Sequence, residues 1–230
     1  MSRIETNLAE IKQRIETACK NCGRNPNEIT LVAVSKMHPV EAITTAREAG
    51  QLHFGENKVQ ELVPKMDAFE NDPEIVWHMI GTLQTNKIKY LAKSVHWIHS
   101  VPKLKALKEI QKRAASEDRV INVLIQVNIS DEDQKSGCEP DDLPGLIQRA
   151  EEMPNLVIRG LMGMASFTDN MDQVRSEFRL LRTLFDQEKA KDYKNAKLEH
   201  LSMGMTNDLE VAIEEGSTML RIGTAIFGER

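Results

Sequence analysis

The sequence predicts a (β/α)8 TIM barrel, a closed ring of eight parallel strands that are each followed by a helix, with an extra helix at the N-terminus. Apolar segments of strand length alternate with segments of helical periodicity along residues 31–223. The strand candidate at residues 123–127 is almost entirely apolar, as expected of a parallel strand that is buried on both faces. A length of 230 residues suits one such barrel, so we expect a single domain over residues 1–230.

An open doubly wound sheet is the alternative arrangement for the same alternation of strands and helices. Such a sheet would favour a glycine-rich turn after its first strand. Residues 35–39 read Ser-Lys-Met-His-Pro and contain no glycine. The closed barrel is therefore the preferred prediction.

The first half of the chain divides at its glycines and prolines. Residues 4–22 carry apolar side chains at helical spacing and are followed by Gly23, which predicts the extra helix. Pro39 ends the first strand and opens the next helix. By the same criteria we expect strands at 31–36, 53–56, 76–81 and 95–101, and helices at 40–49, 59–66, 88–92 and 104–115.

The second half repeats the unit four more times. Val-Leu-Ile-Gln-Val at 123–127 marks the clearest strand, and residues 171–191 form the longest helical pattern. We expect strands at 122–129, 157–164, 198–204 and 219–223, and helices at 143–152, 171–191 and 209–215.

Composition limits the function classes. The net charge of −5 argues against a general nucleic-acid binder, because such proteins present basic surfaces. No apolar run is long enough to span a bilayer, and the polar N-terminus does not resemble a secretory signal. Three cysteines agree with a reducing compartment, so we expect a cytoplasmic protein.

Lys36 is the first candidate for chemistry. It ends the apolar run Leu-Val-Ala-Val-Ser, at the end of a strand where a barrel places its site. Poor hydration at such a position disfavours the ammonium form and leaves a nucleophilic amine. A primary amine of this kind forms Schiff bases with aldehydes and ketones, including pyridoxal 5′-phosphate (PLP).

The loops after the seventh and eighth strands are candidates for a phosphate site, as is usual in this barrel. Ser202 offers a hydroxyl, and Gly204 and Gly223 allow backbone amides to approach an anion. Thr224 begins a short helical segment whose first turn would present free N–H groups.

Arg221 lies on the last predicted strand, two residues before Gly223, and we expect it to point inward. An arginine that faces a pyridine nitrogen stays protonated and keeps that nitrogen unprotonated. The alternative is an arginine paired with an acid such as Glu199 or Glu56.

Other chemistry has weaker support. The six histidines form no HExxH pattern, and Cys19 and Cys22 lack a second CxxC, so we expect no metal site. His78 and His200 lie in predicted strands and could belong to the site or to the core, whereas His96 and His99 are expected at strand edges.

Several long motifs, in order, resemble the pyridoxal phosphate homeostasis protein family. They are LVAVSK (31–36), FGENKVQE (54–61), WHMIGTLQTNK (77–87), QVNISDEDQKSG (126–137), RGLM (159–162) and LSMGMTNDLEVAIEEGSTMLRIGTAIFG (201–228). The resemblance implies a single-domain PLP-binding barrel, similar to the barrel domain of alanine racemase. It also implies a role in binding PLP and handing it on, without an established catalytic reaction.

By this resemblance Lys36 holds PLP as a Schiff base, Arg221 faces the pyridine nitrogen and Asn57 lies beside the cofactor. The phosphate would be held by Ser202, Gly204, Gly223 and Thr224, with Met203 among the cofactor-binding residues. The sequence departs from the family pattern at Lys58, where an aromatic residue is expected, and at Thr206, where serine is usual.

Three functions remain open. A PLP carrier, expected to be a monomer that serves PLP-dependent apo-enzymes, needs only the cofactor site. A PLP-dependent amino-acid racemase needs a second base opposite the lysine, and neither Tyr90 nor Tyr193 lies in a site motif. A Schiff-base aldolase without PLP would bind a phosphosugar instead. Lys58, Lys87 and Lys135 could form a cationic rim through which PLP enters and leaves.

Overall fold

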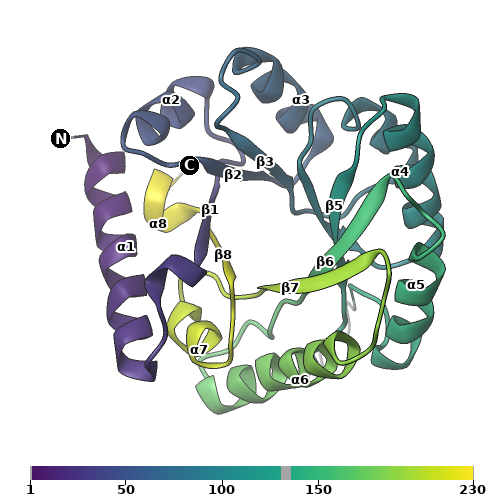
Figure 1. Ribbon diagram of the computed structural model, residues 1–230. Coiled ribbons are helices and arrows are strands. Elements are labelled where there is room, and N and C mark those ends of the chain that lie inside the picture. The colour runs from purple at the N-terminus through teal and green to yellow at the C-terminus, as the bar shows by residue number, and fades with distance from the viewer. Residues whose placement is uncertain (1, 131–135, 230) are drawn as a thin grey trace.

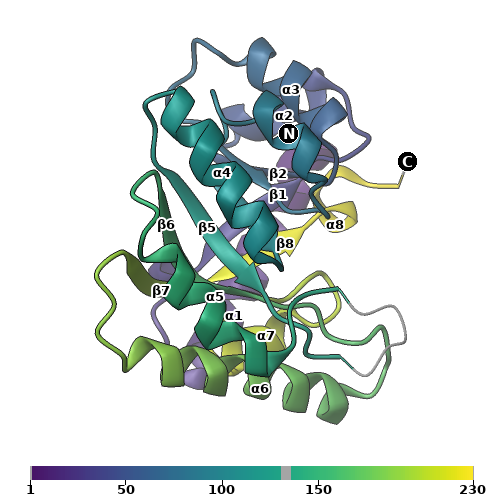
Figure 2. The ribbon, with the colours of Figure 1, turned by 90° about the vertical axis from the view of Figure 1, so that its right-hand side faces the viewer.

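The computed structural model describes residues 2–130 and 136–229. Within them eight parallel strands pair in sequence order, and β1 (Thr30–Val34) closes the ring by pairing with β8 (Met219–Ile222). The helices lie outside this ring (Figure 1). Seen from the side, α4 (Leu104–Ser116) and α5 (Leu143–Ala150) cover the strands behind them (Figure 2). The predicted closed barrel is confirmed, and the open sheet is excluded.

The other elements follow in the expected order. The strands are β2 (His53–Glu56), β3 (Val76–Met79), β4 (Trp97–Val101), β5 (Ile121–Gln126), β6 (Leu156–Met162) and β7 (Ala196–Ser202). The α-helices are α1 (Arg3–Cys22), α2 (Val40–Glu48), α3 (Val59–Ala68), α6 (Met171–Lys189), α7 (Leu209–Glu214) and α8 (Thr224–Phe227). Short 3-10 helices are η1 (Pro26–Glu28), η2 (Thr85–Tyr90) and η3 (Pro140–Asp142).

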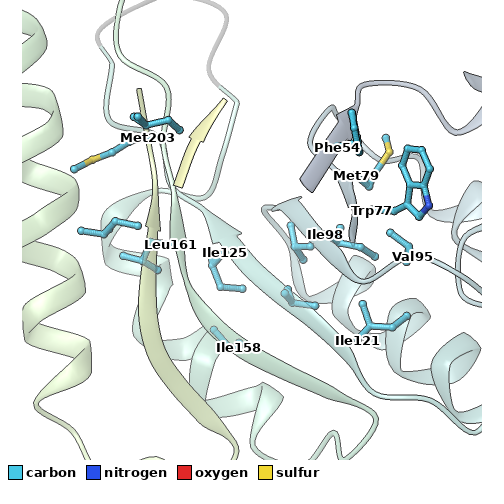
Figure 3. Close-up of a cluster of buried hydrophobic side chains, with 14 of the residues drawn as sticks. Phe54, Trp77, Met79, Val95, Ile98, Ile121, Ile125, Ile158, Leu161 and Met203 are labelled. Atoms are coloured by element: carbon cyan, nitrogen blue, oxygen red, sulfur yellow. The ribbon is translucent and has the colours of Figure 1, made fainter. Parts of the chain in front are cut away.

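The main hydrophobic core lies between the strands and the helices, and we refer to it as the outer layer. Helix residues such as Ile43, Leu107 and Phe178 are fully buried there against outward-facing strand residues. Figure 3 shows part of this layer, including Phe54 on β2 and Ile125 on β5. Because alternate residues of a strand point to opposite faces, the remaining strand positions face the barrel axis.

The extra helix α1 is capped at both ends. The Ser2 hydroxyl accepts the Glu5 N–H, the Glu5 carboxylate accepts the Ser2 N–H, and Gly23 ends the helix with a φ of 72°. The helix lies against α7 and α8 (Figure 1). The Asn7 side-chain amide donates to the Ile226 carbonyl over 2.9 Å. The extra helix thus holds α8 at the rim of the barrel.

Two sequence expectations need correction. Several strands end earlier than predicted, and Lys36 lies in a turn after β1, because the chain leaves the sheet where polar residues begin. The helix predicted over 88–92 is instead the 3-10 helix η2, followed by turns. The 3-10 helix and the turns still bury Ile88, Leu91 and Ala92, so this connection covers the core without completing an α-helix. None of the described helices is long and apolar enough to cross a membrane.

Candidate functional site

A pocket of about 350 Å³ opens at the carboxyl ends of the strands, where barrels of this class place their sites. Five of the predicted site residues meet in it: Lys36, Asn57, Arg221, Gly223 and Thr224. The pocket is completed by Val34, Ile80, Gly81, Thr82, Gln126, Met162, Met164, Met205 and Thr206.

Lys36 lies in a tight turn that several contacts hold in place. The next residue, Met37, has a φ of 63°, and its N–H donates to the Glu61 carboxylate over 2.6 Å. The His38 ring stacks on Phe227 of α8, with centroids 5.1 Å apart. The turn is therefore tied to α3 on one side and to α8 on the other, which fixes the position of Lys36 relative to the last loop of the barrel.

A buried ion pair supports the same turn from below. Lys65 donates to the Glu56 carboxylate over 2.6 Å and to the Ser35 carbonyl over 2.8 Å, and the Ser35 hydroxyl donates to Glu56 over 2.7 Å. Burial raises the pKa of the Glu56 carboxyl, while Lys65 and Ser35 oppose the shift. Glu56 and Lys65 therefore hold the residue that precedes Lys36.

Arg221 is buried and points into the pocket, as predicted. Its Nη1 donates to the Ser202 hydroxyl over 2.6 Å, and its Nη2 donates to the Gly163 carbonyl over 3.0 Å. Burial lowers the pKa of Arg221 to about 10, so the guanidinium stays charged at neutral pH. The proposed acid partners are engaged elsewhere, because Glu199 pairs with Arg159 and Glu56 with Lys65.

The last loop forms the opposite wall of the pocket. Gly223 stands at the start of α8, and a Cβ there would approach the Val34 carbonyl to 3.2 Å. The first N–H groups of α8 have no acceptor within the helix, as at any helix start. Thr224 adds a hydroxyl beside them. This wall can therefore offer backbone and side-chain donors to an anionic group.

Three predicted cofactor-binding residues, two of them assigned to the phosphate, lie outside the pocket lining. Ser202 is fully buried and bonds to Arg221 and His99, and Met203 is buried in the outer layer. Gly204, with a φ of 98°, packs so closely that a Cβ would meet Ala212 at 2.6 Å. These residues shape the loop after β7, while Met205 and Thr206 reach the pocket in their place.

Gln126 is a pocket residue that sequence reasoning missed. It ends β5, and its amide donates to the Ser136 hydroxyl over 3.0 Å. The strand predicted at 122–129 ran past it, so the available signal was a polar side chain within an otherwise apolar run. The methionines Met162, Met164 and Met205 line the pocket as well.

The remaining candidates lie elsewhere. Lys58 is exposed before α3, and the Lys87 ammonium lies 5.8 Å from the Tyr90 ring centroid, so neither lines the pocket. Lys135 falls outside the described residues. His99 is fully buried inside the barrel, which corrects its expected place at a strand edge. In the described parts of the chain, no cluster of three or more histidine, cysteine or acidic side chains could hold a metal ion.

Comparison with known proteins connects this geometry to a family. The model of the alanine racemase N-terminal domain matches residues 6–230. A pyridoxal phosphate homeostasis protein of Haemophilus influenzae is 45% identical over 99% of this chain and 96% of its own length. A solved structure from Bifidobacterium adolescentis, described as an unknown protein, has a TM-score of 0.93 at 32% identity and covers 97% of this chain and 94% of its own.

PipY of Synechococcus elongatus PCC7942, solved with PLP bound, has a TM-score of 0.86 at 32% identity. The match covers 98% of this chain and all of PipY. Similarity at this level over the full length shows common ancestry as well as a common fold. The chain therefore belongs to the pyridoxal phosphate homeostasis protein family, within the group that shares the N-terminal barrel of alanine racemase.

Proposed function

We propose that this chain binds PLP in the pocket at the carboxyl ends of the strands, with Lys36 as the Schiff-base lysine, and serves PLP homeostasis. The observation that carries the proposal is the convergence of Lys36, Arg221 and Gly223–Thr224 on one pocket. PLP is bound by PipY, and homeostasis is the role named for the Haemophilus relative. Free cysteine thiols accord with action in the reducing cytoplasm.

The residues present fit the chemistry of this cofactor. When bound, PLP supplies an aldehyde that condenses reversibly with a primary amine. Lys36 supplies that amine from a turn held by Glu61 and by the ion pair under Ser35. Arg221, a buried cation without a carboxylate partner among residues 2–130 and 136–229, would face the ring nitrogen and keep it unprotonated.

The phosphate is assigned to the wall formed by Gly223, Thr224 and Thr206. Gly223 leaves room at the start of α8, and the two threonines provide hydroxyl donors. Asn57 stands beside this space. Its backbone packs tightly against Gly81, since a Cβ added at Gly81 would lie 2.3 Å from the Asn57 carbonyl oxygen. Ser202, Met203 and Gly204 act behind this wall by shaping the loop and holding Arg221.

A racemase is the second candidate, because the family model is that of a racemase domain. Racemisation needs a second base on the face opposite the lysine. Tyr90 is exposed on η2, and the Tyr193 hydroxyl donates to Glu188 on α6, so neither tyrosine lines the pocket. This arrangement favours a carrier over an efficient racemase.

Delivery of PLP to apo-enzymes is the activity we assign to this carrier. Exposed apolar side chains follow the carboxyl ends of β1, β6 and β7, namely Met37, Met164, Phe167 and Met205, and two of them, Met164 and Met205, line the pocket itself. Phe167 is 92% exposed, and exposed methionine surfaces adapt to several partners. A protein that acts as a monomer could dock a recipient enzyme at this mouth.

Borohydride reduction followed by peptide mass spectrometry tests the lysine. After incubation with PLP, we expect a pyridoxyl mass on the peptide that contains Lys36, and none there in Lys36→Ala. Lys58→Ala is the matched control, since Lys58 is exposed outside the pocket, and it should leave the adduct unchanged. An unmodified Lys36 peptide with excess PLP would overturn the cofactor assignment and favour an aldolase that binds a phosphosugar.

Reactivation of a PLP-depleted enzyme then separates the carrier from the racemase. The loaded protein should reactivate the enzyme faster than the same concentration of free PLP, and Phe167→Ser should slow transfer several-fold while PLP loading is kept. Turnover of an amino acid that disappears in Lys36→Ala, without faster reactivation, would favour the racemase.

A further inference from the structure

A chain of buried polar side chains crosses the barrel interior and ends at Arg221. His53 Nδ1 lies 3.0 Å from His78 Nε2, and His78 Nδ1 lies 2.8 Å from His99 Nε2. His99 Nδ1 lies 2.9 Å from the Ser202 hydroxyl, which accepts from Arg221 over 2.6 Å. We refer to His53, His78, His99 and Ser202 as the histidine column.

The column replaces the side chains that usually fill such a barrel. Interiors of this fold are generally packed with branched apolar residues. Here His78, His99 and Ser202 are all fully buried. Burial lowers the pKa of His78 and His99 well below the ordinary value, and it also lowers the pKa of His53. The three imidazoles are therefore neutral at pH 7, and each carries one proton.

The donors and acceptors available to Ser202 determine which way these hydrogen bonds point. The Ser202 oxygen already accepts from Arg221, and His99 is its other partner. If His99 donated to Ser202, the serine proton would have no acceptor among the described residues, at a substantial cost in a buried site. Ser202 therefore donates to His99 Nδ1, and the protons of His99 and His78 lie on Nε2 and point to the next imidazole.

The charge of Arg221 favours the same direction. With every donor pointing away from the guanidinium, each group of the column presents its lone pair toward the positive charge. The reverse arrangement would place N–H dipoles against a buried cation.

We propose that the histidine column is a positioning device for Arg221: it commits the Ser202 proton to His99, so that the serine oxygen acts only as an acceptor for the guanidinium. Held by neutral acceptors, Arg221 keeps its full charge. Its two contacts engage two of its five N–H groups among the described residues and leave three for the pocket. The consequence for PLP rests on the proposed function, whereas the proton arrangement itself does not.

The proton arrangement can be measured in the wild-type protein without PLP. Two-dimensional 15N–1H spectra of the histidine side chains at pH 7 should show His53, His78 and His99 as neutral tautomers with the proton on Nε2. Nδ1–H tautomers at His78 and His99, or an imidazolium at either, would overturn the proposal. Because no variant is needed, this outcome does not depend on whether a mutant folds.

Two substitutions at His99 then test the effect on Arg221. His99→Asn keeps an acceptor near the Nδ1 position, whereas His99→Leu removes it, and both lose the bond to His78. We expect His99→Leu to weaken PLP binding about tenfold and to shift the absorption band of bound PLP, and His99→Asn to stay within about threefold of wild type. Equal effects of the two variants on both readouts would contradict the proposal.

Ser217→Ala is the matched control for loss of a buried hydroxyl. Ser217 is as buried as Ser202, but its hydroxyl donates to the Met203 carbonyl over 2.7 Å and forms no hydrogen bond with Arg221. It should leave the PLP band unchanged, and Ser202→Ala should shift it. If the tautomers are as expected but borohydride leaves Lys36 unmodified, the proposed function fails while the column stands. If Lys36 is modified but the tautomers are reversed, only the column is wrong.

Discussion

The two faces of the strand ring differ in chemistry. The outer layer is apolar and continuous, with residues such as Phe178 fully buried between strands and helices. The inner face carries His78, His99 and Arg221, all buried and linked by hydrogen bonds. The comparison indicates that the outer layer supplies most of the stability, which leaves the interior free to carry polar groups that serve the pocket.

The largest expected effect comes from opening the outer layer. Phe178→Ala removes a fully buried ring from α6, so we expect the free energy of unfolding to fall by about 4 kcal/mol. Urea titration measures this loss. At a temperature where the variant remains folded, its Lys36 should still be modified after borohydride reduction. Loss of the Lys36 adduct in the folded variant would show that the two faces do not act separately.

The ion pair of Glu56 and Lys65 is a polar exception in the outer layer, and breaking it is the second test. Lys65→Met leaves the Glu56 carboxylate buried without a cation, and we expect a loss of about 3 kcal/mol at pH 7. Burial already raises the folded-state pKa of Glu56 above its unfolded value, and removing Lys65, which opposes that shift, raises it further. The loss should therefore shrink as pH falls toward the unfolded pKa, where Glu56 of the folded variant is protonated.

The double variant Glu56→Leu/Lys65→Met is the control for that experiment. It removes both charges from the buried site, so the stability should recover at least in part. A double variant as unstable as Lys65→Met would show that packing around the lysine, rather than the unpaired charge, causes the loss.

Acid is the mildest way to disturb the inner face. The folded-state pKa values of His78 and His99 lie below their unfolded value of about 6.5. Their contribution to the free energy of unfolding is therefore complete above that pH and is lost as pH falls. Each histidine should cost about 1.4 kcal/mol per pH unit below about pH 6.5. The free energy of unfolding of wild type and of His99→Asn can be measured between pH 7 and 5. Its slope against pH should be smaller in the variant by the contribution of one histidine, about 1.4 kcal/mol per pH unit. Identical slopes would contradict the buried neutral state of His99.

The order of elements and several site residues could be predicted from the sequence by itself. Alternation of apolar strands and periodic helices identifies a parallel barrel, because short connections and two-sided burial leave few other arrangements. Lys36, Arg221 and Gly223 were found because the fold places strand ends around one mouth. The family motifs added Asn57, which lines the pocket.

Only the tertiary structure decided which of these residues share the pocket and which support it. Ser202 ends β7, two residues before the predicted strand end at Gly204. It faces the barrel axis and bonds to Arg221, because strand alternation and barrel closure set its direction. The histidine column joins residues from β2, β3, β4 and β7, which are as many as 149 positions apart along the chain (His53 to Ser202). No local pattern predicts such contacts, since hydrogen-bond partners inside a closed barrel depend on the stagger between strands.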